Sequence, residues 1–398
     1  TFLPFAKPDI SEEAIADVAD SLRSGWITTG PKALKFEKSF GEYLGVPYAL
    51  AVNSATAGLH LSLLAFGIGP GDEVITTPMT FAATANTVIL TGARPVLADI
   101  DPVTFNIRPE LVKKALTPRT KALIPVHFAG RPCEMEALEE IAEKNGLVII
   151  EDAAHALGAS RRGRPIGSPA RQRQAAVFSF HPTKNITTGE GGMVCTACED
   201  AAERVSVLRQ HGMSKGAWNR YAATGTPHYD LLFPGLKYNM LDIQAAIGND
   251  QLTRLASFNA RRREIVNMYR KGLEGLPGLA LPPEPAQGDV HSWHILTPLI
   301  DIDYLGFSRD EFMARMRELN IGTALHYQAL HLFSYYGREY GWKRGDFPGA
   351  EFVSDRIVSI PLFPAMTNGD VADVIEAIRR VCGRWERPWR RHPWTFRW

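Results

Sequence analysis

Short apolar segments alternate with longer amphipathic ones through the first half of the chain. Six of the short segments have the length and aliphatic composition of buried strands. Longer segments with helical spacing, such as Glu134–Asn145, lie between them. Strands that alternate with crossover helices predict an α/β fold with a mostly parallel sheet covered on both faces. The predicted strands are Tyr48–Val52, Glu73–Thr77, Arg94–Ala98, Ala122–Val126, Leu147–Ile150 and Ala175–Ser179.

The pattern changes after residue 240. Met240–Leu273 has helical spacing, and the Pro-rich segment Leu276–Gln287 that follows it marks a domain boundary. Beyond this segment, the apolar run His294–Ile300 and the helices Arg309–Leu319 and Asn368–Val381 predict a smaller α+β domain. We assign residues 1–255, with the N-terminal segment, to the large domain, residues 256–384 to the small domain and residues 385–398 to a tail.

Composition and charge narrow the possible functions. A chain of 398 residues, 45% of them hydrophobic, is long enough for a large core and most simply for two domains. A net charge of +1 gives no overall attraction to nucleic acid or to an acidic membrane. The sequence shows no secretory signal and no apolar run that could span a bilayer.

The four cysteines are few and irregularly spaced. Cys195 and Cys198 form a C-x-x-C pair, but no second pair accompanies them, and Met193–Thr196 has the composition of another strand. Buried or free thiols in a reducing cytoplasm therefore explain the cysteines better than a metal or redox site, and no metal is expected.

The most informative chemistry lies where two predicted strands end. Leu147–Ile150 leads to Asp152, and Ala175–Ser179 leads to a glycine-containing loop that carries Lys184. A lysine amine can form a Schiff base with an aldehyde cofactor, and an aspartate at the end of a strand can keep a pyridine nitrogen protonated. This pair indicates pyridoxal phosphate chemistry and an aminotransferase.

Other candidates follow strands in the same way. Asn53–His60 has the hydroxyls and free amides of a phosphate-binding helix N-terminus, although an ordinary Ser/Thr cap would explain it as well. Phe81 could stack on a cofactor ring or belong to the core. His155 lies one turn beyond Asp152, and Ser179 could add a hydroxyl to a phosphate site. Their joint occurrence at successive strand ends favours a shared cofactor site.

These residues lie within motifs that resemble a known family. The chain is similar, from about Leu3 to Gly383, to the DegT/DnrJ/EryC1/StrS sugar aminotransferases, and within that family most similar to enzymes that make UDP-4-amino-4-deoxy-L-arabinose. The matching segments are Gly25–Pro31, Ser54–Gly58, Pro125–Gly130, Glu151–Ala156, Phe178–His181, Lys184–Thr187, Gly235–Asp242, Asn259–Glu264 and Gly322–Tyr327.

The resemblance implies a type I PLP-dependent (aspartate aminotransferase-like) fold, with a seven-stranded sheet in the large domain, and specific roles for individual residues. Lys184 would be the Schiff-base lysine and Asp152 the partner of the pyridine nitrogen. From its position one turn after Asp152, and not from the resemblance, we expect His155 to contact the cofactor ring as a third catalytic and cofactor-binding residue. Phe81 stands where the most similar enzymes have a tryptophan. The implied phosphate ligands are Thr56, Ala57, Ser179 and, from the second subunit of a homodimer, Asn239; the implied substrate-binding residues are Thr29, His181, Lys237, His326 and Tyr327.

The resemblance also implies a reaction. An amino group would pass from L-glutamate, which becomes 2-oxoglutarate, to a nucleotide-linked 4-keto sugar, either a UDP-4-keto-pentose or a 4-keto-6-deoxyhexose, for surface glycan, lipid A (lipopolysaccharide) or natural-product biosynthesis. Family members that dehydrate sugars have histidine in place of the lysine, so Lys184 favours transamination. A 3-keto sugar aminotransferase and a non-catalytic regulatory protein on the same fold stay open as alternatives.

The tail departs from the rest of the sequence. Arg384–Trp398 interleaves tryptophans with arginines, and two prolines exclude a long helix. Such a segment could pack on the surface of the dimer through tryptophan burial and arginine stacking. The less favoured alternative is attachment to an anionic membrane surface.

Overall fold

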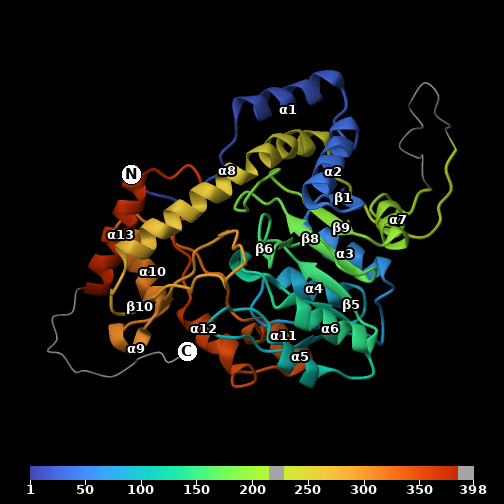
Figure 1. Cartoon of the computed structure of the whole chain (residues 1–398). Coiled ribbons are helices and arrows are strands. Elements are labelled where there is room, and N and C mark those ends of the chain that lie inside the picture. Colours follow the sequence, from blue (N-terminus) through green and yellow to red (C-terminus); the bar gives the residue numbers. More distant parts are fainter. Residues whose placement is uncertain (215–227, 384–398) are drawn as a thin grey trace.

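A mixed seven-stranded sheet forms the centre of the molecule, in the order β1-β9-β8-β5-β4-β2-β3 (Figure 1). The computed structural model describes residues 1–214 and 228–383, so the interpretation of the tail at residues 385–398 lies outside the described residues. All seven strands occur where the sequence predicts them, within two residues at either end. Their bounds are β1 Tyr48–Val52, β2 Glu73–Thr76, β3 Arg94–Leu97, β4 Thr120–Ile124, β5 Val148–Asp152, β8 Gln174–Ser179 and β9 Gly192–Thr196.

Six of these strands run in one direction, and β9 runs against both of its neighbours, β1 and β8. The connection between β8 and β9, residues 180–191, contains no helix that could carry the chain back across the sheet, so β9 returns antiparallel. The carboxyl ends of β1, β2, β4, β5 and β8 therefore meet at one edge of the sheet, which is where ligands bind in folds of this class.

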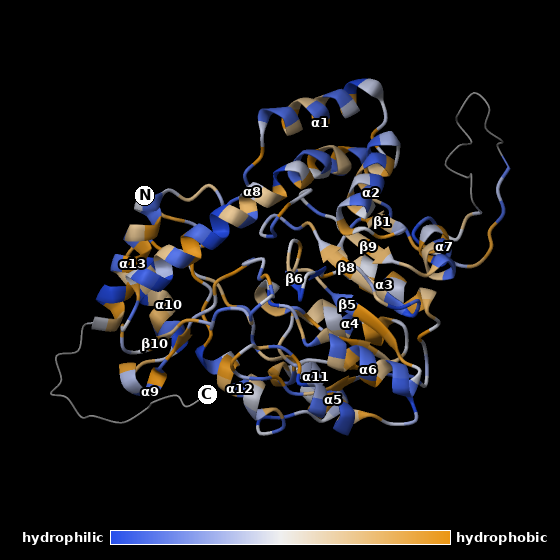
Figure 2. Ribbon diagram, viewed as in Figure 1, coloured by the Kyte–Doolittle hydropathy of each residue, from blue (hydrophilic) through white to orange (hydrophobic). Residues whose placement is uncertain are grey.

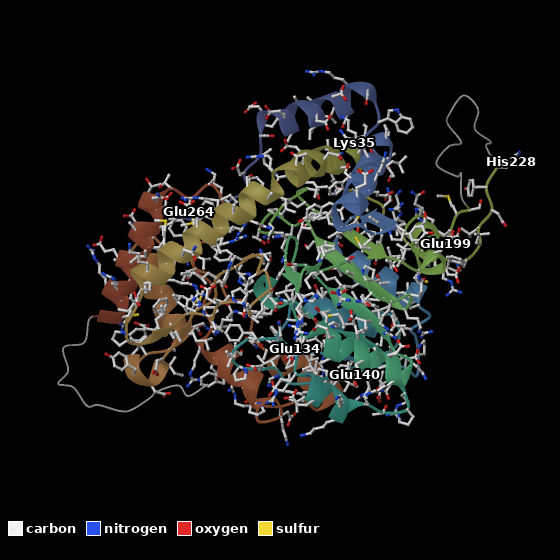
Figure 3. All side chains as sticks on the ribbon, viewed as in Figure 1. Lys35, Glu134, Glu140, Glu199, His228 and Glu264 are labelled. Atoms are coloured by element: carbon white, nitrogen blue, oxygen red, sulfur yellow. The ribbon has the colours of Figure 1, made fainter. Side chains whose placement is uncertain are left out.

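Helices cover both faces of the sheet, as the alternating pattern predicts. Side chains from α3, α4 and α7 pack on one face, and side chains from α2, α5, α6 and α8 pack on the other. In Figure 2 the apolar colour is concentrated at the sheet. The labelled residues Glu140 on α6 and Glu264 on α8 in Figure 3 are exposed, as is Glu134, which precedes α6. The helices are α1 Glu12–Ser24, α2 Pro31–Leu44, α3 Ala55–Ala65, α4 Ala82–Leu90, α5 Pro109–Ala115, α6 Met135–Asn145, α7 Glu199–Leu208 and α8 Asp242–Gly272.

A second hydrophobic cluster is built by the C-terminal part of the chain. The last turns of α8 pack there against α10 and α13, next to the two-stranded sheet of β10 and β11. Of the apolar run His294–Ile300, only the last two residues form a strand. The predicted division at residue 255 falls inside the continuous helix α8 and stays a prediction. The remaining elements are β6 Ser160–Arg161, β7 Arg164–Pro165, β10 Leu279–Ala280, β11 Leu299–Ile300, α9 Ile302–Leu305, α10 Arg309–Glu318, α11 Ser334–Tyr340, α12 Pro348–Arg356 and α13 Asn368–Gly383.

One carboxylate joins the start of α8 to the start of α2. Asp242, the first residue of α8, is fully buried and accepts hydrogen bonds from the backbone N–H groups of Gly30 at 2.7 Å, Ala33 at 3.0 Å and Lys32 at 3.1 Å. These are N–H groups that the first turn of a helix cannot pair internally. Asp242 therefore fixes the turn that carries Thr29.

None of the helices in the described part of the chain has both the length and the apolar character needed to cross a bilayer.

Candidate active site

The carboxyl edge of the sheet brings Lys184 and Asp152 together, as the sequence predicts. Lys184 lies in the connection between β8 and β9, where its backbone N–H donates to the carbonyl of His181 at 2.9 Å. The following residue, Asn185, is buried and donates to the carbonyl of Ser292 at 2.9 Å and to the side chain of Asn259 at 2.7 Å. The lysine is thus carried by a loop that is anchored on both sides of it.

Burial lowers the pKa of Lys184 to about 8, and the negative charge of Asp152 opposes this shift. Asp152, which ends β5, is 7% exposed, and burial raises the pKa of its carboxyl group. Its two oxygens accept hydrogen bonds from the hydroxyl of Thr84 at 2.8 Å and from the backbone N–H of Ala154 at 3.2 Å. A neutral amine is therefore accessible close to neutral pH beside an oriented carboxyl group.

His155 lies next to this pair and has a defined tautomer. Its Nδ1 accepts the backbone N–H of Ala129 at 3.2 Å, and its Nε2 lies 3.0 Å from the hydroxyl of Tyr327. Burial holds the pKa of His155 well below its usual value, and the positive charge of Lys184 acts in the same direction. A neutral imidazole whose Nδ1 is an acceptor carries its proton on Nε2. His155 therefore presents an N–H group toward Tyr327.

Phe81 is an exposed aromatic ring at the same edge. It is the residue before α4 and is 60% exposed, and its ring centroid lies 6.0 Å from that of Tyr327. A core phenylalanine would be buried, so the exposed ring favours the stacking interpretation over the alternative that Phe81 belongs to the core.

The predicted phosphate turn follows β1. The hydroxyl of Ser54 caps α3 and accepts the backbone N–H of Ala57 at 3.1 Å, whereas Thr56 is exposed. A Cβ atom on Gly192, at the start of β9, would lie 2.7 Å from the backbone of Ser54. Gly192 pairs with Ser179 across the strands, so the start of α3 and Ser179 are close neighbours. This closely packed turn, with the exposed Thr56 in the first turn of α3, suits a phosphate group.

His326 is held by Ser359 and Phe5 and is close enough to Lys184 for the lysine charge to act on its pKa. Its Nδ1 lies 2.8 Å from the hydroxyl of Ser359, and its ring contacts that of Phe5 with centroids 5.3 Å apart. Burial lowers its pKa to about 4, and the positive charge of Lys184 adds to the shift. His326 is therefore a neutral hydrogen-bonding group near neutral pH.

Thr29 and Asn239 form a second group beside the phosphate turn. The amide of Asn239 donates to the hydroxyl of Thr29 at 2.7 Å, and the backbone of Asn239 pairs with Val52 of the same chain. Lys237 is exposed, and its carbonyl accepts the side-chain amide of Asn53 at 3.3 Å. In this chain Asn239 thus lies next to its own phosphate turn.

His181 is exposed, and its Nδ1 lies 3.0 Å from the hydroxyl of Thr183. Burial lowers the pKa of His181, and the nearby Glu190 opposes the shift. His181 is thus the predicted substrate residue that faces solvent on the lysine loop.

Two residues of the site were missed by the sequence analysis. Thr84 bonds Asp152 although the two are 68 residues apart, and a threonine in the first turn of a helix after a strand was the only available signal. His294 is 1% exposed, neither of its ring nitrogens has a hydrogen bond within the described structure, and its ring centroid lies 4.4 Å from that of His155. Its sequence position, inside an apolar run, gave no indication of this contact.

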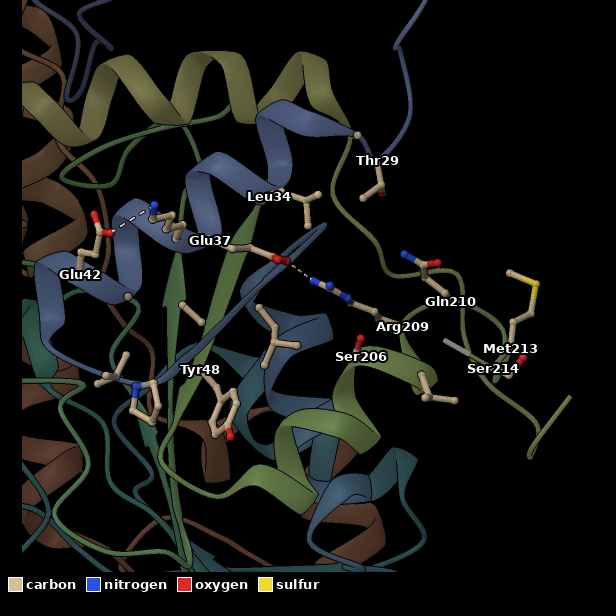
Figure 4. A pocket seen from close by; sticks show the side chains of 18 of the residues that line it. Thr29, Leu34, Glu37, Glu42, Tyr48, Ser206, Arg209, Gln210, Met213 and Ser214 are labelled. Atoms are coloured by element: carbon tan, nitrogen blue, oxygen red, sulfur yellow. Dashed lines mark hydrogen bonds and ion pairs between the residues drawn. The ribbon is translucent and has the colours of Figure 1, made fainter. Parts of the chain in front are cut away.

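A separate cavity lies away from Lys184 and Asp152. It has a volume of about 930 Å³ and follows α2, β1 and the end of α7, where Glu37 and Arg209 form an ion pair that also bonds the backbone of Ala51 (Figure 4). Thr29 is the one predicted site residue that lines it. Because β1 is an edge strand, the sheet leaves the backbone N–H and C=O of Ala51 without a partner strand. The ion pair forms hydrogen bonds with both groups. The described residues contain no cluster of histidine, cysteine and acidic side chains suited to a metal ion.

The chain is 49% identical to the uncharacterized protein MJ1066 of Methanocaldococcus jannaschii, over 96% of this chain and 98% of that protein. It is 47% identical to the spore coat polysaccharide biosynthesis protein SpsC of Bacillus subtilis, over 96% and 97% of the two chains.

Among solved structures, the fold is similar to that of Spr1654 of Streptococcus pneumoniae, which is described by its sequence family as a sugar aminotransferase and has been solved in PLP and PMP forms. The TM-score is 0.88 with 32% identity, and the match covers 96% of this chain and 99% of the other. Residues 8–379 match the DegT/DnrJ/EryC1/StrS aminotransferase family. The chain therefore belongs to the DegT/DnrJ/EryC1/StrS family and is a PLP-dependent sugar aminotransferase.

Proposed function

We propose that the enzyme transfers the amino group of L-glutamate to a nucleotide-linked 4-keto sugar, a UDP-4-keto-pentose or a 4-keto-6-deoxyhexose, in the synthesis of a surface glycan, lipid A or a natural-product sugar. The observation that carries the catalytic part is the pairing of Lys184, with a pKa near 8, and the buried Asp152 at the carboxyl edge of the sheet. The similarity to a polysaccharide biosynthesis protein supports a sugar acceptor for a cell-surface product.

The residues present fit the cofactor. Lys184 would hold its aldehyde carbon, Asp152 its pyridine nitrogen, and the turn at Thr56 and Ser179 its phosphate group. The close approach of Gly192 to the backbone of Ser54 supports this assignment, because it brings the start of α3, with the exposed Thr56, next to Ser179. When bound, pyridoxal phosphate supplies an electron-withdrawing ring for the carbon that loses its proton.

Lys184 would then act as the base and acid of the reaction. Its amine would take the proton from the α-carbon of the donor and pass it to the aldehyde carbon of the cofactor. In the second half of the reaction it would carry a proton back from that carbon to the keto carbon of the sugar, which receives the amino group. A pKa near 8 suits this function because both protonation states are available near neutral pH. The N–H of His155 at Nε2 would hydrogen-bond the cofactor or the substrate when the hydroxyl of Tyr327 moves away from it.

The remaining predicted residues would bind the substrates. The neutral imidazole of His326 and the hydroxyl of Tyr327 would contact the donor carboxylate. Thr29, His181 and Lys237 would line the path of the nucleotide sugar. We further propose a homodimer in which Asn239 serves the phosphate site of the partner, and a cytoplasmic location, consistent with the absence of disulfides among the four cysteines.

A panel of nucleotide-linked keto sugars tests the proposal. Purified enzyme with L-glutamate is assayed on UDP- and dTDP-linked 4-keto and 3-keto sugars, with Lys184→Ala as the control for background amination. We expect repeated release of 2-oxoglutarate, beyond one equivalent per active site, only when a 4-keto substrate is present. Turnover confined to a 3-keto sugar would contradict the regiochemistry, and glutamate-independent turnover would contradict the donor.

A further inference from the structure

Three buried side chains form a hydrogen-bonded series that ends on Asp152. The hydroxyls of Thr80 and Thr84 lie 2.9 Å apart, and Thr84 donates to an oxygen of Asp152 at 2.8 Å. Thr80 is 2% exposed, Thr84 is fully buried and Asp152 is 7% exposed. Burying two hydroxyl groups is unfavourable unless both are hydrogen-bonded, so the series has to be paired within the protein.

The direction of the series follows from the last acceptor. An ionised carboxylate can only accept, so Thr84 must use its single hydroxyl proton on Asp152. Its oxygen is then free to accept, and Thr80 donates to it. The order is therefore Thr80 to Thr84 to Asp152, and it is defined only while Asp152 is ionised.

The same turn also carries Phe81. Phe81 precedes the first residue of α4, and the backbone N–H of Thr84 donates to the carbonyl of Phe81 at 3.2 Å. One helical turn thus sets both the exposed ring of Phe81 and the hydroxyl that bonds Asp152. These are the two groups proposed to contact the face and the nitrogen of the cofactor ring.

We propose that Thr84, supported by Thr80, is a positioning residue that holds the Asp152 carboxylate in a fixed orientation for the pyridine nitrogen of the cofactor. This inference rests on the proposed role of Asp152. The hydrogen bond also opposes the effect of burial on the Asp152 carboxyl, because a donor favours the ionised form. The titratable groups that act on Asp152, or are acted on by it, are Lys184, His127 and Tyr327.

Thr84→Val tests the inference, because valine keeps the shape of threonine and removes the hydroxyl. We expect kcat to fall roughly 10- to 100-fold, as for the loss of a hydrogen bond to a charged group, with a smaller change in the KM for glutamate. The affinity for pyridoxal phosphate, measured by equilibrium dialysis, should fall. The acidic limb of the kcat profile should move to higher pH, because the pKa of Asp152 rises when its donor is lost.

Two variants serve as controls for Thr84→Val. Thr84→Ser keeps the hydroxyl and should restore most of the activity and the pH profile. Thr87→Val removes a fully buried hydroxyl from the same helix, where Thr87 donates only to the backbone carbonyl of Thr84 at 3.1 Å. It should leave the pH profile and the cofactor affinity unchanged. An equal effect of Thr87→Val, or an unshifted profile in Thr84→Val, would overturn the inference.

Thr80→Val gives a test that does not depend on the folding of the Thr84 variant. In this variant Thr84 loses its donor but keeps its hydrogen bond to Asp152. The changes in kcat, cofactor affinity and pH profile should therefore be in the same direction as in Thr84→Val but smaller. No change in any of these quantities would argue against the series. Comparing the single variants Thr84→Val and Asp152→Asn separates this inference from the proposed function. A severe Asp152→Asn defect with a silent Thr84→Val contradicts the inference alone, whereas near-normal kcat in Asp152→Asn contradicts the proposed function.

Discussion

The backbone N–H of Ala129 donates to Nδ1 of His155 over 3.2 Å and thereby decides which ring nitrogen of the histidine carries the proton. Ala129 has a left-handed backbone conformation, with φ of 56°, which is unfavourable for a residue with a side chain. Ala129 lies in the short turn Phe128–Gly130, where it departs from the helical conformation. A strained turn is thus kept at the site where it directs the proton of His155 toward Tyr327.

Replacing Lys184 with alanine should lower turnover by about 1000-fold or more, because the covalent anchor and the proton-transfer group are lost together. The midpoint temperature of thermal unfolding should be the same for the cofactor-free variant and the cofactor-free wild type. Lys35→Ala, at an exposed position on α2, is the matched control and should have wild-type activity. Borohydride trapping followed by peptide mapping would contradict the assignment if it labelled a different lysine.

Asp152→Asn should lower kcat by about 100-fold or more while the KM for glutamate changes little, since a neutral amide cannot hold the pyridine nitrogen protonated. Steady-state kinetics over a range of glutamate concentrations separate the two parameters. A variant with a raised KM and normal kcat would place Asp152 in donor binding instead.

The reactivity of Lys184 should titrate with a midpoint near pH 8 in the cofactor-free enzyme, because burial lowers the pKa of its amine to about 8. An ordinary lysine titrates near 10.4. The rate of covalent attachment of pyridoxal phosphate should therefore rise with pH and level off above pH 8.

Asp152→Asn should move this midpoint to lower pH, because the carboxylate favours the protonated amine. Attachment that still accelerates steadily above pH 9 in the wild type would contradict the lowered pKa.

Gly192→Ala should weaken cofactor binding, because the new Cβ would lie 2.7 Å from the backbone of Ser54 and Ala55 and would displace the start of α3. Gly369→Ala, on α13, is the control, since its nearest neighbour is 3.6 Å away. Equilibrium dialysis of pyridoxal phosphate measures the effect. Unchanged affinity in Gly192→Ala would remove the phosphate group from this turn.

Mixing two inactive chains tests whether sites are shared. If Asn239 serves the partner's cofactor, Lys184→Ala mixed with Asn239→Arg should recover activity, because one of the two sites in the heterodimer then contains both intact residues. Arginine is preferred to alanine, since loss of one buried hydrogen bond costs only about 1 to 3 kcal/mol. No recovery in confirmed heterodimers would show that Asn239 acts beside its own Thr29.

The strands that carry the site could be predicted because each is a short apolar run that ends abruptly in polar residues. Asp152 and Lys184 follow such ends, and parallel strands place them at one edge whatever the details of packing. The run His294–Ile300 shows the limit of this reasoning. Its apolar residues are buried as expected, but only Leu299 and Ile300 pair as a strand, because an apolar pattern indicates burial and does not specify a pairing partner.

Side-chain partners could not be predicted in the same way. Thr84 and Asp152 are brought together by the order of β2 and β5 in the sheet, which the sequence pattern leaves undetermined. The contact of His294 with His155 likewise joins two distant loops. The family resemblance indicated the types of residue at the site but not the hydrogen bonds that orient them.

Helix α8 joins the two hydrophobic clusters as a single rod. Its 31 residues correspond to a length of about 46 Å. One end is tied through Asp242 to the turn that carries Thr29, and the other is packed among the C-terminal elements. A rotation of one cluster against the other must therefore bend this rod or break the Asp242 cap, so the mechanical stiffness of α8 limits how far the two clusters can rotate.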